Sequence, residues 1–147
     1  MPGKVGIQAP ARKRYCPNFT NAIEYCCESD EIADLFSGFK SPWFFLETAE
    51  EYQKLFEETG FEVVHCRIDE VHQNFTPEKA LDVFNSGAAA GYLNQQYFSQ
   101  PLPEDFSEKV SRGVKESFDE QASSTGEVDL IFNRVYLVAE IRVNNAN

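Results

Sequence analysis

Apolar side chains recur at helical spacing in several segments of the chain. The clearest segment begins at the capping box Thr48–Glu51, in which the threonine hydroxyl and the glutamate carboxylate satisfy free backbone N–H groups. Gly60 supplies the left-handed residue that ends this helix. Similar stripes, caps and breaks predict further helices over residues 18–28, 30–36, 76–85 and 103–121. Residues 87–98 contain two glycines and are predicted as helix or loop.

Three other apolar segments follow strand-like patterns. Residues 61–69 are rich in β-branched side chains with partial alternation, which predicts a strand directly after the helix. Residues 127–143 hold the longest β-prone stretch, and Val135–Ala139 within it is nearly continuously apolar, as in a strand buried on both faces. The apolar run Ser41–Leu46 is opened by a proline and predicts a strand or an extended loop.

The order of these segments predicts an α/β fold in one domain. Residues 1–17 carry prolines and glycines without periodicity and predict an irregular lead-in, with a short extended piece at residues 5–7. The rest of the chain, residues 18–147, is predicted to form a single α/β region. Its parts are a helix–strand unit over 48–69, a helical insertion over 70–126 and a closing strand over 127–143.

Composition agrees with one globular domain and restricts its partners. The chain has 147 residues, of which 42% are hydrophobic and 14% aromatic, more than a disordered chain keeps in water. Its net charge of −11 disfavours nucleic acid and anionic lipid, because phosphates would be repelled. The sequence contains no apolar run of membrane-spanning length and no signal-peptide pattern. We therefore expect a soluble cytoplasmic protein with no nucleic-acid or membrane partner.

Few side chains suggest acid–base, metal or thiol chemistry. The four cysteines include no Cys-x-x-Cys pair, so neither a zinc ribbon nor a thioredoxin-like site is predicted, and we expect no metal. His72 follows the predicted strand, where catalytic bases often lie, and could take a proton from an acceptor hydroxyl. A surface histidine without a catalytic role is the alternative. A base–nucleophile pair of His72 with Cys27 or Cys66 is also left open.

The middle and end of the chain resemble a known enzyme family. The run Ser41-Pro42-Trp43-Phe44-Phe45 is followed by the Thr48 capping box, an amphipathic helix, Gly60-Phe61 and a β-branched segment. Leu102-Pro103 then precedes a long helix, and Asn133–Ala139 closes the order. This arrangement resembles the C-terminal half of class I S-adenosylmethionine-dependent methyltransferases, in particular the small-molecule group that includes trans-aconitate and juvenile-hormone-acid methyltransferases. The likeness covers residues 36–143.

The resemblance implies both a fold and an activity. The fold would be a partial Rossmann-like methyltransferase fold, with the C-terminal strands and a helical substrate cap. The activity would be methyl transfer to a small organic acceptor. In such a fold Trp43 and Phe44 would line the acceptor pocket, and Tyr92 and Tyr97 would orient a substrate carboxylate by hydrogen bonding. Ordinary aromatic packing is the alternative for each of these residues.

The cofactor motifs of the family are not found in this sequence. The family holds S-adenosylmethionine at a glycine-rich turn between its first strand and first helix, and at an acidic residue that ends its second strand. Gly3 and Gly6 follow no predicted strand, and Gly87 and Gly91 lie within helical sequence. No cofactor-binding residue is identified. We expect a chain that corresponds to the back half of the enzyme and is incomplete for catalysis alone.

The predicted strands leave one edge of the closing strand open. The strand over 61–69 can pair with only one edge of Val135–Ala139, and an open apolar edge invites pairing with another chain. We therefore expect self-association or a partner strand at this edge, besides a small-molecule substrate. The alternative function is a non-catalytic binding or regulatory module, derived from a methyltransferase, that associates through the same edge. An unrelated small α+β protein is the third interpretation.

Overall fold

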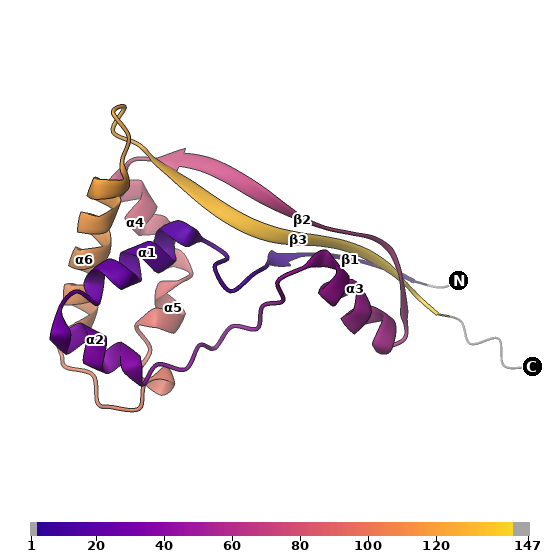
Figure 1. Ribbon diagram of the computed structural model, residues 1–147, viewed down its shortest axis with the longest axis horizontal. Helices are drawn as coiled ribbons and strands as arrows, with labels where there is room; N and C mark the ends of the chain where they lie inside the picture. Colours follow the sequence, from indigo (N-terminus) through magenta and orange to yellow (C-terminus); the bar gives the residue numbers. More distant parts are fainter. Residues whose placement is uncertain (1–2, 143–147) are drawn as a thin grey trace, which may run out of the picture. The chain divides into compact units, whose positions relative to one another are not determined.

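The computed structural model describes residues 3–142, and Figure 1 shows its elements. Three strands form one antiparallel sheet in the order β1-β3-β2, and six α-helices lie between them in the chain, which confirms the α/β class. In chain order the elements are β1 (Lys4–Pro10), α1 (Pro17–Cys26), α2 (Asp30–Ser37), α3 (Ala49–Glu58), β2 (Phe61–Phe75), α4 (Pro77–Ser86), α5 (Ala89–Tyr92), the 3-10 turn η1 (Gln95–Tyr97), α6 (Phe106–Gln121) and β3 (Val128–Ile141).

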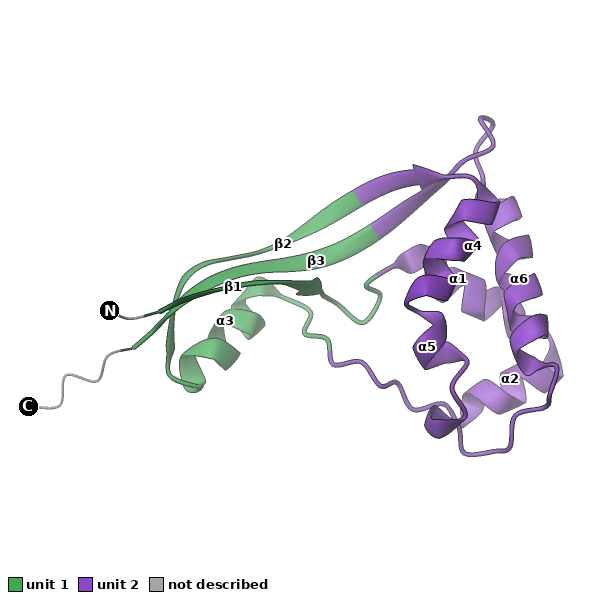
Figure 2. Ribbon diagram, turned by 180° about the vertical axis from the view of Figure 1, so that it is seen from behind, with its two compact units in different colours: residues 1–15, 45–71, 132–147 green, residues 16–44, 72–131 purple. Residues whose placement is uncertain are grey.

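The chain divides into two compact units, which Figure 2 shows in different colours. We call the first the strand unit; it takes its described residues from 1–15, 45–71 and 132–147. We call the second the helical unit; it comprises residues 16–44 and 72–131. The single α/β region expected over residues 18–147 is therefore split, and part of the expected lead-in belongs to the strand unit.

In the strand unit, helix α3 covers one face of the sheet (Figure 1). Tyr52 of α3 is buried against Val135, Leu137 and Ala139, which alternate along β3 and point to the same face. Phe56, one turn further along α3, packs against the same cluster. Successive side chains of a strand point to opposite faces of the sheet. Helix α3 therefore buries the face of β3 that carries these three residues.

Local signals predict the ends of α3 correctly. The Thr48 hydroxyl accepts a hydrogen bond from the Glu51 backbone N–H at 3.1 Å, as the capping box requires. Gly60 has a φ of +100°, a conformation that costs glycine little and other residues more. β2 begins at the next residue, Phe61, which confirms the expected order of helix, glycine and strand.

β1 corrects two expectations. Residues 4–10 form a strand where an irregular lead-in with a short extended piece at 5–7 was expected. β1 pairs antiparallel with β3 along the expected open edge, with Val5 opposite Ala139 and Ala9 opposite Val135. The expectation that this edge of Val135–Ala139 is unpaired is therefore wrong. In the described residues the outer edges of the sheet belong to β1 and β2.

β2 is longer than its sequence pattern indicates. It runs to Phe75 instead of Asp69, so the helical segment between β2 and β3 begins at Thr76 and not at residue 70. The additional residues are mostly polar and exposed, and pairing with β3 extends the strand despite this composition. Thr76 caps the next helix, accepting a hydrogen bond from the Lys79 N–H at 3.3 Å.

Helices α1, α4 and α6 pack together in the helical unit around aromatic side chains. Phe19 of α1 lies edge-on to Phe84 of α4, with ring centroids 5.4 Å apart, and 6.1 Å from the ring of Phe118 on α6. Phe84 and Phe118 are fully buried. Val110 and Val114 extend the buried stripe along α6 at the predicted spacing of four residues.

The opposite face of α6 is charged and solvated. Ion pairs join residues one turn apart, Arg112 to Glu108 at 3.2 Å and Lys115 to Asp119 at 2.9 Å. At 16 residues α6 is the longest helix between residues 3 and 142. Within this range no helix combines the length and the apolar character needed to cross a bilayer.

Asn18, in the first turn of α1, connects three segments of the helical unit. Its side-chain amide donates to Gln121 Oε1 at 2.9 Å and to the Asp129 carbonyl at 3.0 Å. Its Oδ1 accepts from the Ile131 backbone N–H at 2.8 Å. Gln121 in turn donates to the Ser117 hydroxyl at 3.0 Å. One asparagine therefore joins the start of α1 to the end of α6 and to β3.

The four cysteines are free thiols and are held in the protonated form. Burial is the main cause in each case, raising the pKa of Cys16 and of Cys26 to about 12 and also raising the pKa of Cys27 and of Cys66. A nucleophilic thiolate needs the opposite shift, which argues against Cys27 or Cys66 as a nucleophile.

We expect stability to fall at alkaline pH because of Cys16 and Cys26. Each thiol has a pKa of about 12 in the folded chain and of 9.0 ordinarily, so the folded state keeps its proton at a pH where the unfolded state loses it. The free energy of unfolding is therefore unaffected below pH 9.0 and falls as the pH rises from 9.0 toward 12. The slope approaches about 1.4 kcal/mol per pH unit for each thiol. Urea unfolding at a series of pH values measures it. A variant with alanine at both positions is the control, and an equal slope in that variant would contradict the assignment.

Candidate functional site

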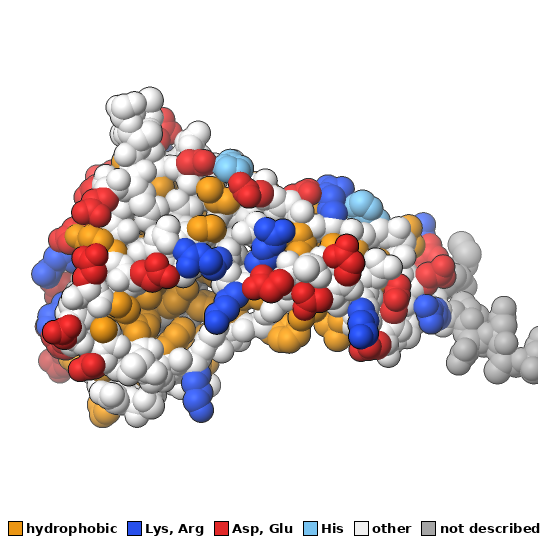
Figure 3. Space-filling view, in the orientation of Figure 1, with side chains coloured by type: hydrophobic (Ala, Val, Ile, Leu, Met, Phe, Trp, Pro, Cys, Tyr) orange, Lys and Arg blue, Asp and Glu red, His pale blue; other side chains and the backbone are white. Residues whose placement is uncertain are grey.

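Aromatic rings gather in the helical unit where α2, the segment after it and α5 meet. We call this group the aromatic cluster; its members are Phe36, Phe39, Trp43, Tyr92 and Phe98. The rings of Phe39 and Tyr92 stack with centroids 5.6 Å apart, and Trp43 lies edge-on to Tyr92 at 4.9 Å. Four of the five residues are only partly buried, and Figure 3 shows hydrophobic side chains gathered on this face of the helical unit.

The cluster rests on the core of the helical unit. The buried ring of Phe84 stacks on Tyr92 almost in parallel, with centroids 6.0 Å apart. Phe106, at the start of α6, lies edge-on to Phe98 at 5.4 Å. Stacked and edge-to-face aromatic pairs have defined geometries and add to the stability that burial provides. The partly buried rings of the cluster are therefore held in place by the buried rings of Phe84 and Phe106.

Gly91 in α5 allows Trp43 to lie against the helix. A Cβ added at Gly91 would be 2.6 Å from Trp43 Cη2 and 3.2 Å from Pro42 Cγ, and the first distance is too short for two carbon atoms. The indole ring therefore occupies the space that a larger residue would need. This contact, with the edge-on contacts to Phe39 and Tyr92, orients the single tryptophan of the chain.

We expect Gly91→Ala to displace the Trp43 ring. The new methyl group forces the indole outward, shifting its emission to longer wavelength and lowering stability by about 1–3 kcal/mol. Because Trp43 is the only tryptophan, the emission spectrum measures the change directly. Gly87→Ala is the matched control, since a Cβ at Gly87 would meet no atom within 4 Å. An unchanged spectrum in Gly91→Ala would show that Gly91 does not orient the ring.

A cavity of about 410 Å³ adjoins the aromatic cluster. We call it the Lys40 pocket, and its lining includes Lys40, Ser41, Pro42, Gln96, Tyr97 and Phe98. The Lys40 backbone N–H donates to the Tyr97 carbonyl at 2.8 Å, which joins the two walls. Gly38 and Ser99 also line it, and a Cβ at Gly38 would overlap Ser99 Oγ. One backbone hydrogen bond and one close approach of a side chain to the backbone therefore join the two walls.

The structure brings together most of the predicted aromatic site residues. Trp43 and Tyr92 are in contact in the aromatic cluster, and Tyr97 lines the adjoining pocket. Phe44 is 72% exposed and belongs to neither. The structure adds Phe36 and Phe39, whose spacing of three residues at the end of a helix was a signal that sequence reasoning passed over. Lys40, next in the sequence, was missed as well.

His72 lies within β2 and not after its end. Its Nδ1 is 2.9 Å from Asp129 Oδ2, and both side chains are about half exposed. Neither residue is a member of the aromatic cluster or lines the Lys40 pocket. A base role for His72 stays a prediction, and its contact with Asp129 is the feature the structure adds.

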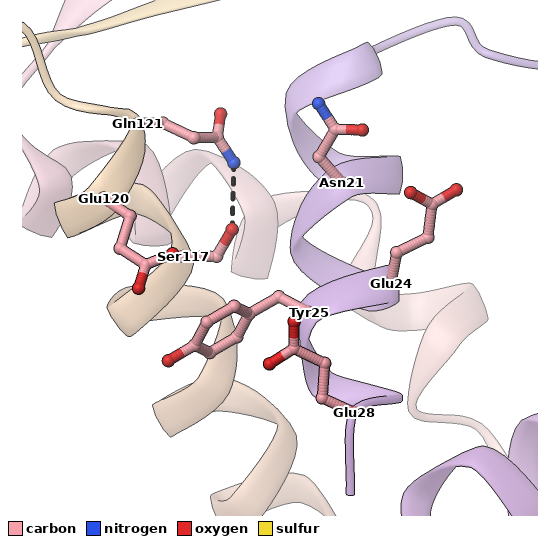
Figure 4. Close-up of a pocket in the computed structure, with 7 residues that line it drawn as sticks. All are labelled: Asn21, Glu24, Tyr25, Glu28, Ser117, Glu120 and Gln121. Carbon is pink, nitrogen blue, oxygen red and sulfur yellow. Dashed lines mark hydrogen bonds between the residues drawn. The ribbon is translucent and has the colours of Figure 1, made fainter.

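A second cavity, of about 430 Å³, lies between α1 and α6 (Figure 4). Its lining includes Glu24 of α1, Glu28 in the turn after α1 and Glu120 of α6. Tyr25, beside them, donates its hydroxyl to Glu116 at 3.1 Å, and this hydrogen bond raises the tyrosine pKa. Residues 3–142 contain no group of three or more histidine, cysteine or acidic side chains arranged to hold a metal ion. This cavity is best described as an acidic, solvated groove.

The described residues do not fit S-adenosylmethionine. The family would place it at a glycine-rich turn between a strand and a helix. β1 leads to α1 through residues 11–16, which contain no glycine, and Thr76 alone separates β2 from α4. Cys16 at the start of α1 makes no side-chain cap hydrogen bond, and Arg12 holds a positive φ of 69° before it. This connection offers none of the close backbone approach that the motif provides.

Comparison with protein-family models finds no match for the chain. Comparison with curated proteins finds no match either.

Proposed function

We propose that this chain binds the small organic acceptor of a methyl-transfer reaction, as the substrate-cap and C-terminal part of a class I S-adenosylmethionine-dependent methyltransferase. The observation that carries the proposal is the aromatic cluster with its adjoining Lys40 pocket. Residues 36–43, in α2 and the segment after it, and residues 91–99, between β2 and β3, build this site together. An aromatic, partly enclosed site of this size suits a small molecule.

The order of elements supports the proposal. From residue 48 onward, α3 and Gly60 lead into β2, helices follow, and β3 closes the order, as in the family the sequence resembles. In that family the final strand is paired on both edges, and β3 is paired by β1 and by β2. The partial Rossmann-like fold therefore remains our proposal for this sheet.

The chemistry proposed for these residues is binding and orientation. Methyl transfer depends mainly on aligning the nucleophile, the methyl carbon and the leaving sulfur, so a site that fixes the acceptor away from water supplies much of the effect. S-adenosylmethionine would supply the methyl group. Trp43 and Tyr92 would hold the apolar body of the acceptor, and Tyr97 would orient its polar end. We expect no catalysis by this chain alone.

Two titrations of the purified chain test the proposal. Calorimetry with S-adenosylmethionine is expected to give no saturable heat, because the described residues lack its motif. Trp43 emission is expected to change saturably with a small aromatic acid, and Tyr92→Ala should weaken that response. Saturable cofactor binding would contradict the incomplete site, and a tryptophan signal that no small acid or ester changes would contradict acceptor binding.

A non-catalytic module is the second candidate, and the outer edge of β1 is the observation that favours it. This edge has no strand partner in the described part of the chain, and edge strands pair readily with other chains. Because β1 covers the edge of β3 that was expected to be open, we propose that the chain associates through the outer edge of β1 instead. Sedimentation equilibrium should show a dimer that Gln8→Lys weakens, since Gln8 is exposed and a charge disfavours edge pairing. A monomer at high concentration would count against this function.

A further inference from the structure

We infer that the Lys40 pocket binds a small organic monoanion with an apolar body, such as an aryl-alkyl carboxylate. The inference concerns binding and goes beyond the proposed function, since it holds whether or not the ligand is a methyl acceptor. It is drawn from the charge, the hydrogen-bonding groups and the walls of the cavity.

Lys40 makes this cavity electrostatically different from the acidic cavity between α1 and α6. The chain carries 24 acidic and 13 basic side chains, yet Lys40 is the one charged residue that lines the pocket. The cavity of about 430 Å³ between α1 and α6 is lined by three glutamates and no basic residue, and a neighbouring cavity is lined by three glutamates, Lys109 and Arg112. An anion is therefore repelled from the first of these cavities and attracted to the Lys40 pocket.

The Lys40 ammonium is available to a ligand. Lys109 and Lys115 of the same unit each pair with carboxylates, at 3.2 Å and 2.9 Å. Among residues 3–142 no acidic side chain forms such a pair with Lys40. A bound carboxylate would provide that partner without breaking an existing ion pair.

Hydroxyl groups beside Lys40 supplement its charge. Ser41 Oγ accepts a hydrogen bond from the Trp43 backbone N–H at 3.2 Å, which leaves the Ser41 hydroxyl hydrogen to be donated elsewhere. Tyr97, a second residue with a hydroxyl group, also lines the pocket. A carboxylate has two oxygens that accept hydrogen bonds, so it suits one ammonium and two hydroxyl groups.

The other wall of the pocket is apolar. Phe98 is 8% exposed, and its ring packs against that of Phe39 with centroids 5.0 Å apart. It therefore gives the pocket a fixed apolar surface. Pro42 lines the same side and lies next to Trp43 in the chain. The cavity, at about 410 Å³, holds a ring and a short alkyl chain with room for solvent. The charged and apolar walls together select an amphipathic anion.

The test compares 4-phenylbutyrate with its neutral amide, 4-phenylbutyramide, on the full chain. Calorimetry and Trp43 emission both measure the dissociation constant, so binding that leaves the indole unperturbed is still detected. We expect saturable binding of the carboxylate, about tenfold tighter than that of the amide, and a preference that weakens as salt is added. The two probes have nearly the same shape, so the difference isolates the charge.

Lys40→Gln is expected to bring the affinity for the carboxylate down to that for the amide and to leave the affinity for the amide unchanged. Lys40 is exposed, so this substitution should not disturb folding, and circular dichroism verifies that. Lys79→Gln is the matched control, because Lys79 is exposed in the same unit but does not line the pocket. Equal binding of the two probes, a preference retained in Lys40→Gln, or no saturable binding would overturn the inference.

Discussion

Replacing Phe118 by alanine is expected to lower the free energy of unfolding by about 3–5 kcal/mol, the largest loss we predict for one substitution. Phe118 is fully buried on α6 and its ring lies 6.1 Å from that of Phe19 on α1. Alanine removes the apolar surface of the ring and leaves a cavity, because the two helices cannot close around it completely. Urea unfolding followed by circular dichroism measures the loss.

The control for this substitution lies on the same helix. Glu120→Ala changes an exposed residue two positions further along α6, and we expect it to alter stability by less than about 0.5 kcal/mol. The comparison separates loss of the core from the effect of an added alanine on helix propensity. A Phe118→Ala protein as stable as the Glu120→Ala protein would mean that α1 and α6 are not packed as described.

Replacing Asn18 by alanine is expected to cost about 2–4 kcal/mol. The change removes two donated hydrogen bonds and two accepted ones, the second being a long bond from the Cys16 thiol at 3.9 Å. Gln121 Oε1, the Asp129 carbonyl and the Ile131 N–H lose this partner. Polar groups that lose their partners in a partly buried site cost more than the average hydrogen bond contributes. Chemical denaturation measures the effect, and hydrogen exchange at Ile131 should accelerate.

Asn85→Ala is the matched control for Asn18. It makes the same chemical change at an exposed position in the last turn of α4, and we expect a change within about 0.5 kcal/mol. A double-mutant cycle between Asn18 and Gln121 then isolates their direct contact. Additive effects in that cycle would show that the side-chain pair contributes little and that the bonds to the backbone carry the loss.

Elements whose signals are local in the sequence were predicted well. The capping box at Thr48, the left-handed Gly60 and the proline after Thr76 act within one turn of the chain, so the sequence alone determines them. β1 was missed because its stabilisation comes from β3, far away in the sequence. The polar end of β2 was missed for the same reason, since its own residues do not favour a strand.

Some residues of the candidate site could also be predicted from the sequence, and others could not. Trp43 and Tyr92 could be singled out because aromatic residues are conspicuous in the sequence and suited the family resemblance. Lys40 could not, because an exposed lysine has no special pattern and gains its meaning only when Tyr97 is placed opposite it. The role of Gly91 likewise depends on the position of the Trp43 ring, which no local rule determines.

The pairing of β1 with β3 has a consequence for the time at which the sheet can form. Lys4 lies opposite Glu140, so the two strands meet only after nearly the whole intervening chain has been synthesised. On the ribosome, β1 must wait without its partner while the individual helices, whose backbone hydrogen bonds are local, can already form. During that interval the β1 segment depends on solvent or on a chaperone for its backbone hydrogen bonds.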